Sequence, residues 1–147
     1  MNVNQLNLQH SLRTHLASVM GVNVVWVYDG VTLPNETAKP FMTVKQMQNN
    51  TAIVAKIREA VETTHRFQIG LHAATATDRS RLQERVKRTL LFDKIPLIDL
   101  DQPTRPVVGF FYAEVRNETP IDADSTDAKN MYHRIYFDVE IDVHYYG

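Results

Sequence analysis

The last sixteen residues of the chain, 132–147, alternate between apolar and polar side chains. Because successive side chains of a β-strand point to opposite faces, this period of two predicts one long strand with an apolar face and a charged face. The apolar positions are Ile135, Phe137, Val139, Ile141, Val143 and Tyr145, and the polar positions are Arg134, Tyr136, Asp138, Glu140, Asp142 and His144. A terminal segment frays unless other structure holds it, so we expect this strand to be paired within a sheet.

Two helices are predicted ahead of this strand. The first covers 4–20, where leucines recur at helical spacing, with Asn4 as its cap and Gly21 as its stop. The second covers 78–92, with Thr77 or Asp78 as its cap. The apolar stripe of the second helix, which should face the core, consists of Leu82, Val86 and Leu90.

The remaining regular segments are predicted to be strands, because they are rich in β-forming residues and end at turn signals. They cover 22–28, 41–49, 62–72, 95–100 and 107–117. The segment 51–58 has two interpretations, since Ile53, Val54 and Ile57 fit one helical turn as well as the arm of a long hairpin. Residues 31–40 and 118–130 are predicted to be loops.

The predicted order of elements is therefore α-β-β-β-α-β-β-β. Strands joined directly to strands, with only two helices, favour an α+β fold in which a mainly antiparallel sheet carries both helices on one face. A chain of 147 residues is of the usual size for one domain, and we expect residues 1–147 to form a single domain.

Composition limits the classes of protein to which the chain can belong. There is no cysteine, which excludes disulfides and thiolate metal sites and indicates folding in a reducing cytoplasm. No apolar run approaches the roughly 20 residues that cross a bilayer, and the first residues do not resemble an export signal, so no membrane partner is expected.

The charge of the chain is unevenly distributed. Residues 1–113 hold 13 Lys and Arg against 9 Asp and Glu, whereas residues 114–147 hold 3 against 8. Unlike surfaces of this kind suit a subunit that stacks on copies of itself or lines a channel. Clustering by chance in a small protein explains the distribution equally well.

Three carboxylates, Asp138, Glu140 and Asp142, share the charged face of the C-terminal strand. Neighbours on one face stand roughly 6–7 Å apart along a strand, which is too far for one ion to bind all three closely. The residues allow three interpretations: a solvated face, an acidic surface within an assembly, and a metal or catalytic site.

The second predicted helix carries five cations on its outer surface: Arg79, Arg81, Arg85, Lys87 and Arg88. A solvated face, pairing with acids of a neighbouring subunit and contact with nucleic acid are all open interpretations. The six histidines have no metal-binding spacing along the chain, and no phosphate-binding or nucleophile motif occurs. No catalytic residue, metal ligand or cofactor is therefore predicted.

After the N-terminal helix, four segments follow in order: Val24–Tyr28, Gln68–His72, a helix opened by Thr77 and Asp78, and His133–Ile141. In this pattern, over nearly its whole length, the chain resembles the tail terminator, or tail-to-head joining (tail completion), proteins of long-tailed bacteriophages. The resemblance implies a structural virion protein without enzymatic activity or cofactor. Such proteins form a hexameric ring that caps the tail tube, stops its polymerisation and offers a surface to the head.

The resemblance also implies partners and a location. The partners would be other copies of the chain, the major tail tube protein and a head connector or neck protein, while DNA passes through the lumen without specific binding. The protein would be found in the virion, at the tail–head interface, and in the host cytoplasm during assembly.

On this interpretation Asp138, Glu140 and Asp142, or the acids of 118–127, face the lumen, where negative charge repels phosphate. The five cations of the second helix and the apolar residues Ile53, Val54 and Ile57 would contact neighbouring subunits or the tube. Three alternatives stay open: another neck or connector protein of the head–tail interface, a small metal-assisted hydrolase, and a nucleic-acid-binding module.

Overall fold

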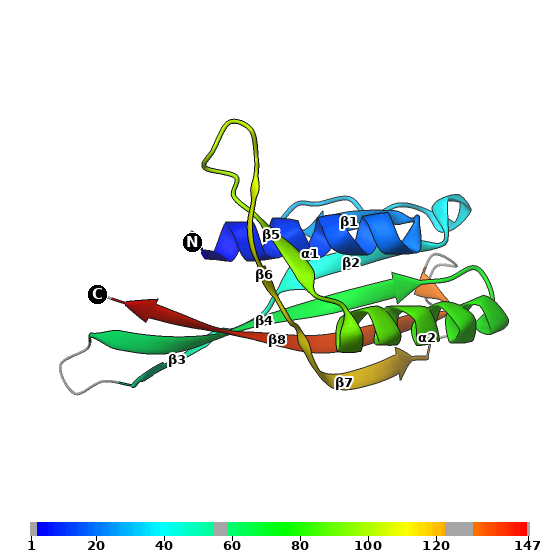
Figure 1. Cartoon of the computed structure of the whole chain (residues 1–147). Helices are drawn as coiled ribbons and strands as arrows, with labels where there is room; N and C mark the ends of the chain where they lie inside the picture. The colour runs from blue at the N-terminus through cyan, green and yellow to red at the C-terminus, as the bar shows by residue number, and fades with distance from the viewer. Residues whose placement is uncertain (1–2, 55–58, 123–130, 147) are drawn as a thin grey trace.

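The structure is a computed structural model that describes residues 3–54, 59–122 and 131–146. It confirms the predicted α+β fold, because a mainly antiparallel sheet carries both helices, α1 (Gln5–Met20) and α2 (Ala76–Phe92), on one face (Figure 1). The strands are β1 (Asn23–Val27), β2 (Phe41–Gln46), β3 (Asn50–Ile53), β4 (Ala60–His72), β5 (Ile95–Ile98), β6 (Val107–Phe111), β7 (Glu114–Ile121) and β8 (Arg134–Tyr146). A short 3-10 helix, η1 (Glu36–Ala38), lies between β1 and β2.

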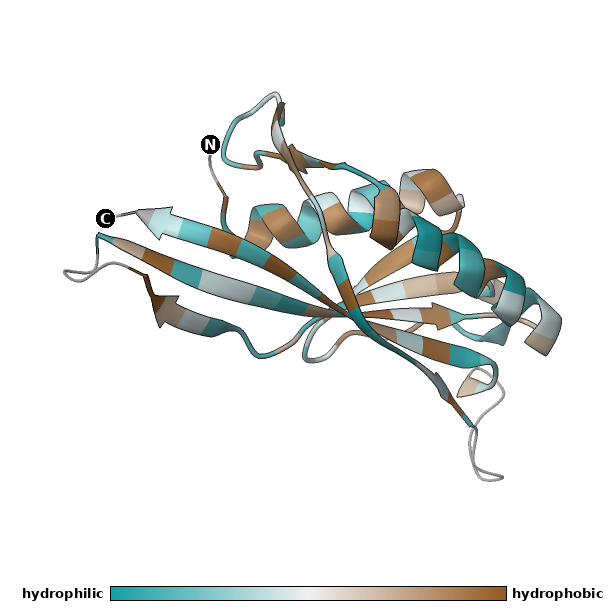
Figure 2. Cartoon of the chain, turned by 60° about the horizontal axis from the view of Figure 1, so that its bottom comes forward, coloured by the Kyte–Doolittle hydropathy of each residue, from teal (hydrophilic) through white to brown (hydrophobic). Residues whose placement is uncertain are grey.

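Within these ranges the main sheet has the order β1-β2-β4-β8-β7, with β3 beside β4, while β5 and β6 form a separate pair. β4 and β8 are antiparallel over 13 residues each, with Phe67 opposite Val139 and Ile69 opposite Phe137. The alternation predicted for the C-terminal strand is confirmed, and it recurs along β4 (Figure 2). We call the side of the sheet that α1 and α2 cover the helical face, and the opposite side the open face.

The core lies between the helical face and the two helices. Leu8, Leu12 and Leu16 of α1 and Val86 of α2 are completely buried, in one cluster with the apolar residues of β4 and β8. Removing such side chains from water is the main force that holds helices on a sheet, at roughly 1.5–3 kcal/mol for each large apolar residue.

Both predicted ends of α1 are confirmed. Asn4 precedes the helix in extended conformation, and its Oδ1 accepts a hydrogen bond from the N–H of Asn7 at 2.9 Å. Gly21 follows the helix at φ 66°, in the left-handed region where glycine carries no steric cost, and its N–H donates to the Ala17 carbonyl.

The second helix begins earlier than predicted. Thr75 has an extended backbone and its Oγ1 accepts a hydrogen bond from the N–H of Asp78 at 3.1 Å, so the prediction of Thr77 or Asp78 as the cap is wrong. Thr77 and Asp78 occupy the first turn, where the carboxylate of Asp78 is favoured by the helix dipole. Thr75, which was not predicted as a cap, is of the same capping type as Thr77 and Asp78, and only the backbone conformation distinguishes among the three.

The structure decides between the two interpretations of the start of 51–58, and it corrects one predicted strand. β3 pairs antiparallel with β4, so residues 50–53 form the arm of a hairpin and not a helical turn; Ile57 lies outside the described residues. The predicted strand 107–117 is two strands in two sheets, because β6 pairs with β5 whereas β7 pairs with β8. β7 also continues to Ile121, into a segment predicted to be a loop.

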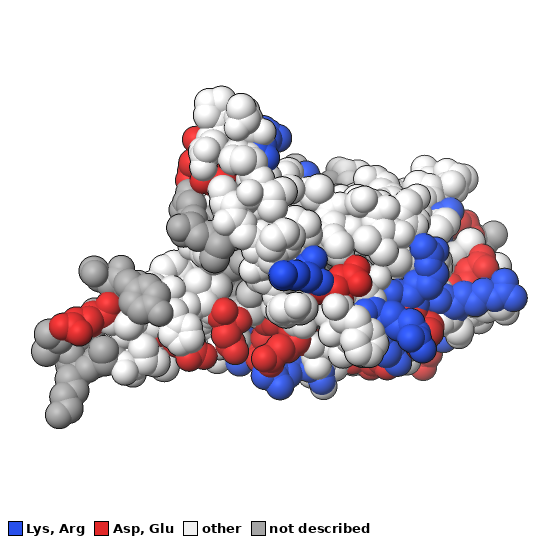
Figure 3. All heavy atoms as spheres, in the orientation of Figure 1, with Lys and Arg blue, Asp and Glu red and all other residues white. Residues whose placement is uncertain are grey.

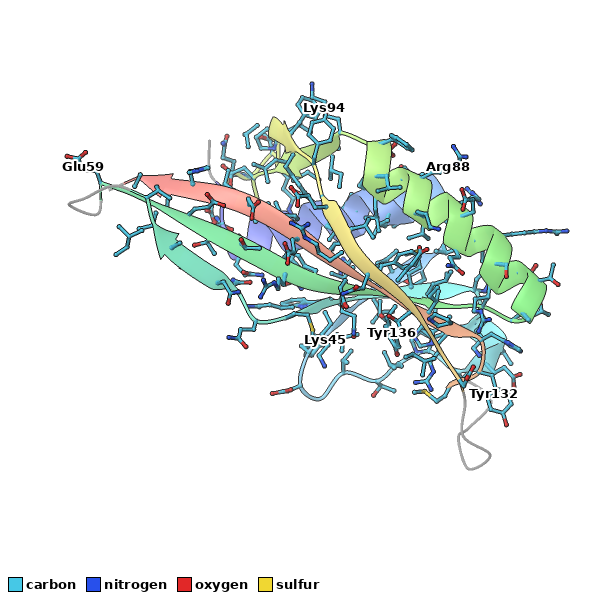
Figure 4. All side chains as sticks on the ribbon, turned by 90° about the horizontal axis from the view of Figure 1, so that it is seen from below. Lys45, Glu59, Arg88, Lys94, Tyr132 and Tyr136 are labelled. Carbon is cyan, nitrogen blue, oxygen red and sulfur yellow. The ribbon has the colours of Figure 1, made fainter. Side chains whose placement is uncertain are left out.

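β1 is the exception to antiparallel pairing, since it runs parallel to β2. The segment 28–40 therefore has to return along the length of the sheet, and it does so on the side away from α2 (Figure 4). Among the described residues, neither helix has the length and apolar character needed to span a membrane.

Candidate interaction surfaces

The three predicted acids do share the open face, but Glu140 belongs to a charge network. It accepts hydrogen bonds from Arg66 Nε at 3.0 Å and from Arg116 Nε at 2.8 Å, and Arg116 also pairs with Glu114. The hydrogen bond from Arg116 and that from Arg66 together hold the pKa of Glu140 below its ordinary value. Glu140 is therefore ionised but largely compensated by cations.

The negative charges of the other two acids, Asp138 and Asp142, are less compensated by neighbouring cations. Asp142 is exposed and accepts a hydrogen bond from Thr64 Oγ1 at 2.7 Å. Asp138 lies in a hollow of about 250 Å³, which carries both signs of charge. The hollow is lined by Met47, Arg66, Phe67, Arg116, Asn117, Asp138, Val139 and Glu140. The open face is thus a mixed surface on which Asp138 and Asp142 supply the least compensated negative charge, and their place in a lumen stays a prediction.

The cations of α2 gather on the exposed surface of the helix (Figure 3). Two of the five have acidic partners within the chain. Lys87 Nζ lies 2.6 Å from Glu118, whose hydrogen bond raises the pKa of Lys87, and Arg88 pairs with Glu84 one turn away. Arg85 donates to the backbone carbonyl of Val19 in α1. Arg81, Arg85 and Arg88 are exposed to solvent. An ion pair in such a position, such as that between Arg88 and Glu84, contributes little to the stability of the fold.

The hairpin arm exposes two of the three apolar side chains that the sequence analysis identified, Ile53 and Val54. Ile53 is 54% exposed and Val54 51% exposed. The two side chains are adjacent in the sequence, whereas exposed apolar residues that are scattered singly need no explanation. They stay candidates for a contact with another subunit.

The histidines are structural where they are buried. His65 is held on the helical face, with Nδ1 2.8 Å from Gln5 Oε1 and Nε2 2.8 Å from the Tyr145 hydroxyl. Burial lowers the pKa of His65 below its ordinary value. His72 stacks on Phe41, with ring centroids 4.5 Å apart. Among the described residues, no three His, Asp or Glu side chains are placed to hold a metal ion.

One surface was not predicted from the sequence. Trp26 and Tyr28 project from the end of β1 with 38% and 55% exposure, and their rings meet edge to face at a centroid distance of 5.3 Å. A hollow of about 390 Å³ lies beside them and also contacts Lys45 and Met47. The signal was present in the sequence, because Trp26 and Tyr28 are two residues apart and share one face of a strand.

Comparison with known proteins gives weak structural similarity and no match of sequence. No family model matches the chain, and no curated protein matches it. The chain aligns over its full length with the sheath/tube terminator of an extracellular contractile injection system (PVC) in the extended state, at 9% sequence identity and a TM-score of 0.47. It spans 59% of that chain. A similarity this weak says nothing about what the present chain binds, so its role has to be argued from its own surfaces.

Proposed function

We propose that this chain is a structural virion protein, the terminator of a phage-type tail. It forms a ring, of six copies by the resemblance of its sequence pattern, on the finished tail tube. The ring ends polymerisation of the major tail tube protein and presents a surface to the head connector. The chain makes and breaks no bond, and its work is done by contacts between subunits.

The observation that supports this proposal is the spread of its exposed charged and apolar side chains over separate surfaces. Cations cover the outside of α2, both signs of charge cover the open face, and apolar side chains project from β3 and from β1. A ring of identical subunits needs two different, complementary surfaces on each copy, and a terminator needs further surfaces for two unlike partners. A chain with several unlike surfaces suits that task.

In the proposed ring the open face points toward the channel. Asp138, Glu140 and Asp142 would then line the channel. DNA must pass without being held, and the less compensated carboxylates of Asp138 and Asp142 disfavour close approach of phosphate. α2 lies on the opposite side of the sheet, so its cations Arg79, Arg81, Arg85, Lys87 and Arg88 point toward neighbouring subunits or the tube. Ile53 and Val54 would contact a neighbour in the same way.

The channel assignment is tested by the double substitution Asp138→Asn and Asp142→Asn, which leaves the Glu140 network with Arg66 and Arg116 intact. We expect particles that assemble normally but release DNA more slowly. Asp101→Asn is the control, because it removes an exposed carboxylate between β5 and β6, apart from the three acids of the open face and from the cations of α2. Particles of the double variant that release DNA at the wild-type rate would show that the open face does not line the channel.

The terminator role is tested by tube assembly. The major tail tube protein of the same virus is polymerised with and without the chain, and tube lengths are measured by negative-stain electron microscopy. We expect tubes of limited length with a ring at one end when the chain is present, and longer, uncapped tubes in its absence. The double substitution Ile53→Asp and Val54→Asp should reduce capping. Tube lengths that do not depend on the chain would refute the proposal.

A further inference from the structure

The end of β1 combines features that protein-binding surfaces share. Trp26 and Tyr28 are large aromatic residues in an exposed position, and aromatic residues with methionine and arginine are enriched at the centres of interfaces. Trp26 also separates two hollows. On its far side, a hollow of about 100 Å³ lies against α1, between Leu6, His10 and Arg13. An apolar side chain of a partner could therefore be received on either side of the indole.

The edge of the sheet at β1 is unprotected. β1 pairs with β2, and among the described residues no other strand or loop makes a backbone hydrogen bond to Asn23–Val27. The strand contains no proline, no charged residue and no bulge. Natural edge strands usually carry one of these features, because a plain edge accepts a strand from another chain.

The opposite edge of the same sheet shows the usual protection. β7 contains Pro120, which lacks a backbone N–H, and charged side chains at Glu114, Arg116 and Glu118. Its register with β8 also shifts between Val115 and Asn117, as in a β-bulge. The two edges therefore differ: β7 carries features that block the addition of a strand, whereas β1 lacks them and can accept one.

The charges around Trp26 favour an acidic partner. Arg13 and Lys45 line the two hollows, against a single carboxylate, Asp29. His10 lies in the same positively charged surroundings. Burial lowers the pKa of His10, and the positive charges of Arg13 and Arg105 lower that pKa further. A segment with carboxylates at alternate positions would place negative charge near these cations.

We propose that the β1 edge, with Trp26 at its centre, binds an extended acidic segment of another protein by strand addition. The segment pairs through its backbone with the free edge of β1, it places an apolar side chain against Trp26, and its carboxylates lie near Arg13 and Lys45. This inference concerns a surface apart from the open face and α2, and it does not depend on the terminator role.

The probe is a short synthetic peptide in which leucine and phenylalanine alternate with aspartate and glutamate. Trp26 is the only tryptophan of the chain, so its emission reports binding at this site directly. We expect a saturable change in Trp26 emission with the acidic peptide, weakened by added salt, and none with a peptide in which lysine replaces every acid. A peptide N-methylated at alternate residues should lose binding, because it cannot form the strand hydrogen bonds.

Variants locate the site, with a fluorescein-labelled peptide and anisotropy as the readout. Trp26→Ala should weaken binding at least about tenfold, Trp26→Phe should retain most of it, and the double substitution Arg13→Ala and Lys45→Ala should both weaken it and flatten its salt dependence. Tyr112→Ala is the control, because Tyr112 is also an exposed aromatic residue, at 60% against 38% for Trp26, and it lies outside this surface. Far-UV circular dichroism establishes that each variant folds.

Three results would overturn the inference. The first is the absence of saturable binding of the acidic peptide, and the second is equal binding of the lysine peptide or of the N-methylated peptide. The third is a mass that rises with protein concentration in the wild type but not in Trp26→Ala, since the occupant of the β1 edge would then be a second copy of the chain.

Discussion

Substitution of Gly70 tests the packing of the sheet most sharply, because the expected sign opposes the usual one. Gly70 lies in β4, and glycine within a strand is normally destabilising relative to alanine by roughly 0.5–1 kcal/mol. Here a Cβ at position 70 would stand 2.2 Å from Thr43 Oγ1 and 3.0 Å from Cε1 of Tyr136. Thr43 is buried and β-branched, which restricts how far Oγ1 can turn away, and Tyr136 lies opposite Gly70 on β8.

Overpacking of this kind costs about 1–3 kcal/mol, which exceeds the gain in strand propensity. We therefore expect Gly70→Ala to lower the free energy of unfolding by about 1–2 kcal/mol net. For a chain of this length that corresponds to a fall in Tm of roughly 2–8 °C, measurable by circular dichroism.

A double-mutant cycle identifies the contact responsible. Thr43→Ala removes Oγ1, so the cost of Gly70→Ala should shrink in that background. Thr43→Val keeps an atom of similar size at the same place, so the cost should persist there. Gly70→Ala protein as stable as the wild type, or an undiminished cost beside Thr43→Ala, would refute the packing argument.

Two further stability predictions concern His65 and Thr75. Because the pKa of His65 is lower in the folded chain than its ordinary value of 6.5, the unfolded chain binds more protons, and stability should fall as pH drops below about 6.5. Urea unfolding across pH should show a shallower decline in His65→Gln; an identical pH dependence would contradict the assignment. Thr75→Ala should cost about 0.5–2 kcal/mol through loss of the cap, whereas Thr77→Ala should cost almost nothing, and equal costs in thermal melts would contradict the cap at Thr75.

Features that depend on local sequence were predicted well. The alternation from Ile135 to Val143 identified the buried face of β8, and the caps of α1 were correct because Asn4 and Gly21 flank a clear helical repeat. At α2 three capping residues compete within Thr75–Asp78, and hydrophobic pattern does not rank them. The break between β6 and β7 was missed because Val107–Asn117 reads as one β-forming run, although the chain changes sheets within it.

The charge network on the open face lay beyond prediction from sequence. Glu140 meets Arg66 and Arg116, which lie 74 and 24 residues away, so their meeting depends on the register of three strands. The acids were placed on the correct face from alternation alone, yet their partners could not be named without the pairing. The Trp26 surface was missed for a related reason, since the exposure of an aromatic residue depends on which strand forms the edge.

The unequal lengths of strands and helices have a consequence for how the molecule opens. Thirteen residues of β4 and of β8 extend roughly 40 Å, whereas the 16 residues of α1 cover about 24 Å. The outer ends of β4 and β8 thus continue past the helices (Figure 1). Amide hydrogens should exchange with deuterium fastest from Ala60 and Tyr146 inward, and slowest around Phe67 and Phe137. The hydrogen bonds between β4 and β8 can therefore open from the Ala60–Tyr146 end while the half that packs against the helices stays intact.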